Sequence, residues 1–529
     1  MESHCIRQTA LPGASALFTD LLYHPERVTR FYPHAAGDLD AARLLAASIE
    51  YPDARRAALV EALQPLNGDH PSLDRLAQPG TVAVLTGQQV GLFSGPVYTL
   101  YKALTAIQAA RQLTASGTPA VPVFWLATED HDFAEVNQAW AFDSEFAPVS
   151  LRANDVAATG RPVGPRPVGP LPLTGAPLDA LQQALAGFPF GEEVFARVQK
   201  HYAAGTWGST FLELLKEYLA PHGLLFVDPL HGPLRKIGAP LMARAATEAA
   251  ELSAALLRRN AELAAAHYHA QVHFEAETSL FFLLENGERV NLKYRAGEYT
   301  AKDLKLSAAA MAARAETLSP NALLRPVLQD YLFPTVAVVG GPAEIAYFAQ
   351  SEVLYRHLLG HMPVSLSRAA FTLVSPRVAK LLGRYRLSVE QTWANEETLR
   401  ARIAAQLLPA GVNAAIAAAQ KQVTGALEDV RRALATYDAS LVSALTTSER
   451  KMLYQLGKME RKVGREALRR HQRAGLEAAI LHHQLYPHKH LQERFYSMLP
   501  FLATYGEDLI PRLLDHVRLD CPDHQVLVL

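Results

Sequence analysis

The sequence predicts an α/β protein built on a Rossmann-like parallel sheet, with two inserted subdomains and a C-terminal helical coiled coil. Short apolar runs recur before Pro376, and each is followed by turn residues and a helical pattern. The spacing between these runs is irregular, which indicates insertions into the core. The stretch between Pro409 and Pro487 contains no proline and carries the apolar repeat of a coiled coil.

The composition limits the size, compartment and partners of the protein. A chain of 529 residues exceeds what one hydrophobic core usually supports, so a core with insertions or a second domain is expected. Lys and Arg number 51 against 52 Asp and Glu, so a nucleic-acid partner is not expected. Cys5 and Cys521 lie at opposite ends and exclude a disulfide framework or a cysteine-rich zinc site. No apolar stretch has the length of a signal peptide or membrane span, so we expect a soluble cytoplasmic protein without a membrane partner.

The core strands are expected where the apolar runs end in turn residues. Such runs are typical of parallel strands that are buried on both faces, and their alternation with helices indicates a doubly wound sheet. The expected strands are Val82–Leu85, Val121–Leu126, Leu224–Val227 and Val336–Val339, and Val364–Leu366 is a further candidate.

Two stretches interrupt this core. In the first, Arg161–Pro165 is echoed by Arg166–Pro170, which indicates an extended surface segment or a PxxP-type ligand. In the second, Asn286-Gly287 between two strand-like runs predicts a small β-hairpin that could cover the core as a lid. The expected division is an N-terminal segment with the first part of the core (1–143), first insertion (144–222), core strand (223–234), second insertion (235–325), end of the core (326–375), coiled coil (376–490) and C-terminal segment (491–529).

Two long helices that fold back on each other are expected in the coiled coil. Apolar residues alternate by four and three from Val423 to Leu441, and a second phase runs from Met452 to Val463. Thr446 and the glutamate three residues on match a capping box, which predicts the start of the second helix. That helix is basic, but interspersed acids and the lack of an aromatic platform favour a solvated face over an RNA-binding surface.

Candidate site residues follow the expected strands, because open α/β sheets bind ligands beyond the carboxyl ends of their strands. After the first strand, Gly87, Gly91 and Gly95 recur every four residues before Pro96 opens a helix. Glycines let backbone N–H groups approach an anion or a nucleotide ring, although a plain tight turn explains them equally well.

Four carboxylates and an imidazole follow the second strand. Such a cluster is costly to assemble without a cation, a proton or a polar ligand. It suits general base chemistry, sugar or ammonium recognition, or a divalent metal held with ATP. The alternative is that some of these side chains cap the next helix and others face water. The cluster is Glu129, Asp130, His131, Asp132 and Glu135, with Asn137 just beyond it.

A second glycine turn, Gly340-Gly341, follows the fourth strand and precedes a helix. Exposed N–H groups at this helix start would suit a phosphate or carboxylate, and a purely structural turn is the alternative. Arg325, Gln329 and Asp330 precede the strand and could point into the same cleft.

Four motifs in this chain resemble those of the BshC family, the cysteine ligases of bacillithiol synthesis. The C-terminal coiled coil is similar too, so the resemblance spans nearly the whole chain. The chain ends and the proline-rich segment match least. The motifs are Thr86–Pro96 with Tyr98 and Lys102, Phe124–Asp132 with Glu135–Asn137, Leu324–Asp330, and Val339–Tyr347.

The resemblance implies a class I synthetase-like Rossmann core with two connecting insertions, an ATP or ADP site, and a coiled coil that forms a homodimer. The implied reaction is amide formation between the carboxyl group of cysteine and the amine of glucosaminyl-malate, the last step of bacillithiol synthesis. The sequence contains neither a HIGH-type nor a KMSKS-type motif. It also lacks the cysteines that would hold a zinc ion. Three questions therefore stay open: whether an adenylate intermediate forms, how the enzyme selects cysteine, and which metal it uses. The alternatives are another nucleotide-dependent ligase or transferase and a non-catalytic nucleotide-binding scaffold.

The implied chemistry divides the candidate residues among three roles. The catalytic candidates are Asp130, His131 and Asp132, of which His131 or Asp132 would take the proton of the amine. The nucleotide candidates are Thr86, Gly87, Gln88, Gln89, Gly91, Gly95 and Lys102, with Lys102 or Arg368 as cationic partners for phosphate. The substrate candidates are Glu129, Glu135, Asn137, Arg325, Gln329, Asp330, Gly340, Gly341, Glu344 and Arg368.

Overall fold

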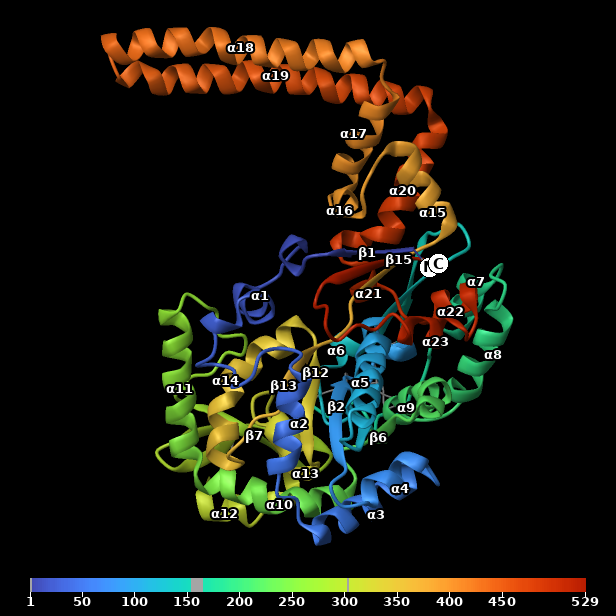
Figure 1. Cartoon of the computed structure of the whole chain (residues 1–529), viewed down its shortest axis with the longest axis vertical. Helices are drawn as coiled ribbons and strands as arrows, with labels where there is room; N and C mark the ends of the chain where they lie inside the picture. Colours follow the sequence, from blue (N-terminus) through green and yellow to red (C-terminus); the bar gives the residue numbers. More distant parts are fainter. Residues whose placement is uncertain (1, 154–164, 302–303) are drawn as a thin grey trace.

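A five-stranded parallel sheet forms the centre of the molecule in the computed structural model, which describes residues 2–153, 165–301 and 304–529 (Figure 1). Its strand order is β13-β12-β2-β3-β6, so the order reverses between β2 and β12. Ligands bind at such a switch point in open α/β sheets. All the expected core strands are confirmed, as β2 (Val82–Gln88), β3 (Ala120–Leu126), β6 (Leu225–Val227), β12 (Thr335–Gly340) and β13 (Val364–Ser367).

Helices cover both faces of this sheet, which explains why its strands are continuous apolar runs. Val82 and Val84 of β2 pack under α5 and α2, whereas Ala83 and Leu85 pack in the layer formed by α3, α10, α13 and α14. The bounds are α1 (Ala16–Tyr23), α2 (Leu39–Ser48), α3 (Asp53–Asn67), α4 (Pro71–Ala77), α5 (Tyr98–Ala115), α10 (Gly232–Thr247), α13 (Arg325–Leu332) and α14 (Pro342–Leu358).

The first insertion follows the short helix α6 (Phe133–Val136). Its proline repeat begins in residues 161–164, which lie outside the described part of the chain. The second copy is not a surface segment, because Val168 is buried and its N–H donates to the backbone oxygen of Asp130 at 2.7 Å. This contact holds the insertion against the loop after β3. The other elements are β4 (Gln138–Phe142), β5 (Pro148–Arg152), α7 (Leu178–Leu185), α8 (Gly191–Tyr202) and α9 (Trp207–Leu219).

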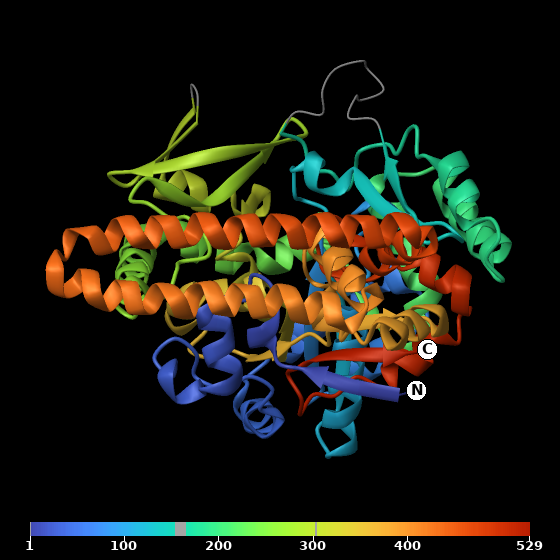
Figure 2. The ribbon, with the colours of Figure 1, turned by 90° about the horizontal axis from the view of Figure 1, so that it is seen from above.

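The second insertion contains the expected hairpin within a larger sheet than the sequence indicated. Asn286 and Gly287 adopt positive φ angles of 53° and 78°, as the two central residues of a tight hairpin turn require. The antiparallel order is β10-β9-β8-β7-β11, and the sheet lies beside the first insertion (Figure 2). The bounds are α11 (Ala249–Ala265), β7 (Thr278–Glu285), β8 (Glu288–Arg295), β9 (Glu298–Ala301), β10 (Leu304–Ser307), α12 (Ala308–Ala312) and β11 (Leu318–Pro320).

The coiled coil is an antiparallel helical hairpin that projects from the body of the molecule (Figures 1 and 2). It consists of α18 (Ala410–Tyr437) and α19 (Ser440–Arg470), so the expected pair of long helices is confirmed. The predicted capping box is wrong, because the hydroxyl of Thr446 donates to the backbone oxygen of Val442 inside α19. The chain turns earlier, where Asp438 accepts a hydrogen bond from the Ser440 N–H at 2.9 Å.

Shorter helices connect this hairpin to the body. Among the described residues, no single helix is long and apolar enough to cross a membrane. The helices α17 and α18 pass that test only as a pair, and they are bent by 115°. The bounds are α15 (Pro376–Tyr385), α16 (Val389–Thr392), α17 (Glu396–Leu407), α20 (Gln472–Leu485), α21 (Gln492–Phe495), α22 (Leu499–Tyr505) and α23 (Leu509–Leu514).

A small sheet joins the two ends of the chain, and the sequence did not indicate it. Its strands are β1 (Glu2–Ile6), β15 (His524–Val528) and β14 (Phe371–Val374). β15 pairs with β1 in the antiparallel direction and with β14 in the parallel direction. β14 comes directly after the core strand β13 in the chain. The small sheet therefore brings the C-terminal segment close to the switch point of the core sheet (Figure 1).

Candidate functional site

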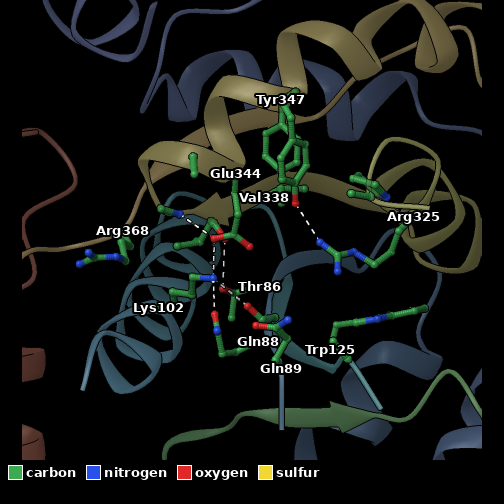
Figure 3. A pocket seen from close by; sticks show the side chains of 18 of the residues that line it. Thr86, Gln88, Gln89, Lys102, Trp125, Arg325, Val338, Glu344, Tyr347 and Arg368 are labelled. Carbon is green, nitrogen blue, oxygen red and sulfur yellow. Dashed lines mark hydrogen bonds and ion pairs between the residues drawn. The ribbon is translucent and has the colours of Figure 1, made fainter. Parts of the chain in front are cut away.

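A cavity of about 510 Å³ opens at the switch point between β2 and β12 (Figure 3). Its walls come from the end of β2, the start of α5, the loop after β3, α13 and the start of α14. The structure brings together here twelve of the residues assigned to the site from the sequence. They are Thr86, Gly87, Gln88, Gln89, Lys102, Asp130, Glu135, Arg325, Gln329, Gly341, Glu344 and Arg368.

The loop after β2 needs glycine for two reasons, which are close packing against β3 and a tight turn. A Cβ on Gly87 would lie 2.7 Å from the backbone oxygen of Trp125, so only glycine fits where β2 meets β3. A Cβ on Gly91 would lie 3.0 Å from the Cα of Gly95, whose own φ is 65°. Gly91 and Gly95 do not line the cavity. The tight-turn alternative is therefore correct for these two, whereas Gly87 belongs to the cavity wall.

Lys102 ties the end of β2 to the start of α14. Its buried ammonium group donates to the backbone oxygen of Gly87 at 2.9 Å and to Oε1 of Gln88 at 2.8 Å, and it forms an ion pair with Glu344 (Figure 3). Burial alone would raise the pKa of Glu344, but Lys102 and the N–H of Gly341 outweigh it and lower that pKa. Lys102 therefore braces the cavity wall, and a phosphate would have to compete with Glu344 for it.

Arg325 presents a positive charge that has no counter-ion among the described residues. Its Nη2 donates to the hydroxyl of Tyr347 at 2.8 Å, and its Nε is buried without a partner (Figure 3). Within the described part of the chain it forms no ion pair with a carboxylate. Removing a guanidinium from water without such a partner is unfavourable, so this wall is suited to an anionic ligand.

Two further guanidinium groups flank Tyr98. Arg368 is buried and forms a two-point ion pair with Glu493, with 2.8 Å between Nη1 and Oε2, and it lies 5.2 Å from the Tyr98 ring centroid. Arg494 is exposed, lies 5.9 Å from the same centroid, and has no ion pair among the described residues. Arg368 is therefore neutralised by the protein, whereas Arg494 is available to a ligand at the rim.

Negative charge gathers on the wall formed by the loop after β3. Gln89 donates from Nε2 to Oδ2 of Asp130 at 2.7 Å and also to Glu135. Burial alone would raise the pKa of Asp130, but hydrogen bonds from Gln89 and the backbone, with the charge of Arg289, lower it. Asp130 is therefore ionised at neutral pH. Among the described residues, no group of three or more His, Cys, Asp or Glu side chains could hold a metal ion.

Eight of the assigned residues do not line this cavity, and Asp330 is the clearest correction. Arg325 and Gln329 line the cavity from one face of α13. Asp330 lies about 100° further around the helix, where it hydrogen-bonds with the hydroxyl of Tyr355 in the core. Burial raises the pKa of Asp330 to about 7. The expectation that Asp330 points into the cleft is therefore wrong.

Five more of these residues lie outside the lining of this cavity, and four of them serve local structure. Glu129 lies 3.7 Å from Arg235 beside a separate small cavity, and Asn137 is buried after α6. Asp132 accepts a hydrogen bond from the third residue of α6 at 3.3 Å, so the capping alternative is correct for it. A Cβ on Gly340 would lie 3.2 Å from side chains of α14, so this glycine allows close packing. His131 contacts Arg289 through Nδ1 and does not line the cavity itself, although its neighbour Asp130 does.

Several lining residues had no role assigned from the sequence. Tyr98 and Tyr347 belong to the motifs that resemble those of the BshC family, so the sequence did indicate that they lie near the site. Gln271 and Arg494 have no local signal, because tertiary packing alone brings them to the cavity. Both also line a second cavity of about 350 Å³ that adjoins the first and is closed by the segment before α1.

The fold and the cavity define a Rossmann-like protein with a charged ligand site at its topological switch point. Residues 1–369 match the family model described as "Bacillithiol biosynthesis BshC, N-terminal Rossmann-like domain". Residues 371–529 match "Bacillithiol biosynthesis BshC, C-terminal coiled-coil domain". The chain belongs to the BshC family.

Full-length relatives agree with this assignment. A protein of Solibacter usitatus named "Putative cysteine ligase BshC" is 48% identical over 529 residues, which is 100% of both chains. Relatives with the same name from Koribacter versatilis and Salinibacter ruber are 37% and 30% identical. The alignments cover 99% of this chain in both cases, and 99% and 98% of those relatives.

Proposed function

We propose that this protein is a cysteine ligase that forms an amide between the carboxyl group of cysteine and the amine of glucosaminyl-malate, the last step of bacillithiol synthesis. The observation that carries the proposal is the charge of the cavity, with the ionised Asp130 on one wall and, on another, Arg325, which has no ion pair among the described residues. An acceptor that carries an amine and two carboxylates matches this arrangement. The names of the relatives support the same reaction.

The carboxylate wall suits the amine of the acceptor. Asp130 and Glu135 share the same donor, the side-chain amide of Gln89, so the two acids are held side by side. An ammonium group bound there would be neutralised, and one carboxylate could take its proton as the amine attacks. The malate carboxylates would then contact Arg325, whose Nε has no partner among the described residues.

Activation of the cysteine carboxyl group requires a nucleotide, and we propose ATP. The start of α14 lines both cavities, and the N–H groups of its first turn favour negative charge. Arg494 at the shared rim adds a cation, and the rings of Tyr98 and Trp125 offer apolar surface in the wall. Bound ATP would supply the leaving group for the cysteine carboxyl, while the residues named above bind and orient the partners.

We also propose that the coiled coil joins two copies of the chain. Its described surface exposes large apolar side chains, among them Tyr437, Met452, Tyr454 and Met459. Such groups on a projecting helical hairpin favour burial against a second hairpin. We expect light scattering to give a dimer for the wild type and a monomer for Met452→Glu/Met459→Glu, with the exposed Lys451→Glu as control. A monomeric wild type would overturn this proposal.

The proposed substrates are metabolites of the cell interior, so we place the reaction in the cytoplasm.

The test of the proposed reaction is mass spectrometry of the purified protein with cysteine, glucosaminyl-malate and ATP. We expect bacillithiol to form only when all three are present. Arg325→Met should raise KM for the acceptor about 10- to 100-fold, the effect of losing a charged hydrogen bond. The exposed Arg314→Met should behave like the wild type, and absence of product from the wild type would contradict the proposal.

A further inference from the structure

Arg289 reaches from β8 of the second insertion to the loop after β3. Its Nη1 lies 3.1 Å from Nδ1 of His131. Its Nε donates to the hydroxyl of Ser319 at 3.0 Å, and its Nη2 donates to the backbone oxygen of Pro320 at 3.0 Å. The guanidinium also stacks 3.9 Å from the ring centroid of Phe282. Every nitrogen of this buried side chain therefore has a partner, and its orientation is determined by the protein.

The contact determines which nitrogen of His131 carries the proton. An arginine side chain remains protonated and can only donate, so Nδ1 of His131 must accept. Burial and the charge of Arg289 lower the pKa of His131, while Asp130 and Asp132 act in the opposite direction without reversing the shift. The ring is therefore neutral with its proton on Nε2. An imidazole in this state donates from Nε2 and has no free nitrogen to take a proton.

Both insertions hold this arrangement in place. The backbone N–H of Arg289 donates to the oxygen of Pro165 at 2.6 Å, which links the two insertions to each other. The N–H of Val168 donates to the oxygen of Asp130 at 2.7 Å, which holds the residue before His131. The side chain of His131 remains 34% exposed, next to Asp130, which lines the cavity.

We propose that Arg289 is a positioning residue that holds His131 as a hydrogen-bond donor toward the reacting carboxyl group. This inference rests on the proposed ligation. As the amine attacks, the C–N bond forms, the bond to the activated oxygen breaks, and negative charge develops on the remaining carboxyl oxygen, where an N–H donor is most effective. The proton of the amine passes to Asp130 or Glu135. The base role expected for His131 is thereby reassigned to the carboxylates of the cavity.

Nuclear magnetic resonance of protein with ¹⁵N-labelled histidine rings tests the tautomer without any assay of the reaction. The signals of His131 are identified by their loss in His131→Asn. We expect Nε2 protonated and Nδ1 unprotonated from about pH 6 to 8, where an ordinary histidine of pKa about 6.5 titrates. In Arg289→Met the ring should titrate at a higher pH than in the wild type, because the charge of Arg289 no longer lowers its pKa. A wild-type ring that is charged or protonated on Nδ1 would overturn the inference.

Ligation kinetics test the positioning. We expect Arg289→Met to lower kcat about 100-fold, the lower end of what a positioned proton donor contributes. Arg289→Lys should recover part of the rate, because an ammonium group can also donate to Nδ1. The exposed Arg295→Met should match the wild type. The pH profile of Arg289→Met should shift toward higher pH, because the charge of Arg289 no longer lowers the pKa of His131. A wild-type rate and profile in Arg289→Met would contradict the inference.

A milder variant covers the case in which Arg289→Met does not fold. Ser319→Ala removes one of the contacts of Arg289 and should lower kcat in the same direction by about tenfold or less. If Arg289→Met does not fold, a wild-type His131 ring that is charged or protonated on Nδ1 still overturns the inference, and so does a wild-type kcat in Ser319→Ala. If the tautomer is as expected but the wild type forms no product, the proposed function fails while the state of His131 stands.

Discussion

The sulfur of Cys5 lies 3.9 Å from the sulfur of Cys521, although 516 positions separate the two residues. Cys5 belongs to β1, and Cys521 precedes β15, the partner strand of β1. Both are free thiols in this structure. The terminal sheet nevertheless brings them close to the distance of about 2.0 Å at which a disulfide forms.

Oxidation should therefore link the two ends of the chain. A small-molecule disulfide should convert the pair to Cys5–Cys521 with loss of two hydrogens, measured by mass spectrometry of the intact protein. Burial, together with Cys521 and Asp523, raises the pKa of Cys5, so the rate should increase as the pH rises into the alkaline range. The link should stabilise the protein by about 2–4 kcal/mol. Cys5→Ser should show neither effect, and a wild type that resists oxidation would contradict the prediction.

Asp330 should make stability fall as the pH rises. Its pKa is raised to about 7 in the folded protein, from an ordinary value of 3.8, so the unfolded chain loses this proton first. Between those values the folded state is progressively penalised, by at most about 4 kcal/mol. Asp330→Asn should therefore raise the thermal midpoint at pH 7 more than at pH 5, with the exposed Asp429→Asn as control. An equal effect at both pH values would show that Asp330 does not titrate as expected.

Arg325→Met should weaken the binding of an anionic ligand without lowering the stability of the protein. The variant removes a half-buried charge that has no ion pair among the described residues, so the thermal midpoint should stay the same or rise. Calorimetric affinity for a dicarboxylate such as malate should nevertheless fall about 10- to 100-fold. Tyr347→Phe, which removes only the partner of Nη2, should give a smaller loss. Unchanged affinity in Arg325→Met would place the anion elsewhere.

Gly87→Ala should destabilise the core, because its Cβ would lie 2.7 Å from the backbone oxygen of Trp125. The strands would have to separate, at a cost of about 1–3 kcal/mol. Gly425→Ala in α18 is the matched control, since its Cβ would meet nothing within 4 Å and the change should stabilise the helix by up to about 1 kcal/mol. Urea midpoints measure both effects, and similar midpoints for the two variants would contradict the packing argument.

Local patterns in the chain predicted much of the fold. The core strands could be located because parallel strands covered on both faces leave continuous apolar runs, as in β3. The hairpin at Asn286 could be located because its turn needs two positive φ angles. The start of α19 could not, because Thr446 fits equally well inside a helix, where its hydroxyl bonds to Val442. The terminal sheet was missed because pairing between distant strands leaves no local periodicity.

By itself, the sequence determined the strands of the core, the two insertions, the coiled coil and the resemblance to the BshC family, because all of these depend on short-range patterns and motifs. Only the tertiary structure decided which polar residues share a cavity. It separated Arg325 from Asp330, which lie on different faces of α13, and it brought Arg494 to the rim. It also placed Arg289 beside His131. The physical reason is that helix phase, the register of paired strands and the packing of insertions set side-chain positions over distances that no local pattern spans.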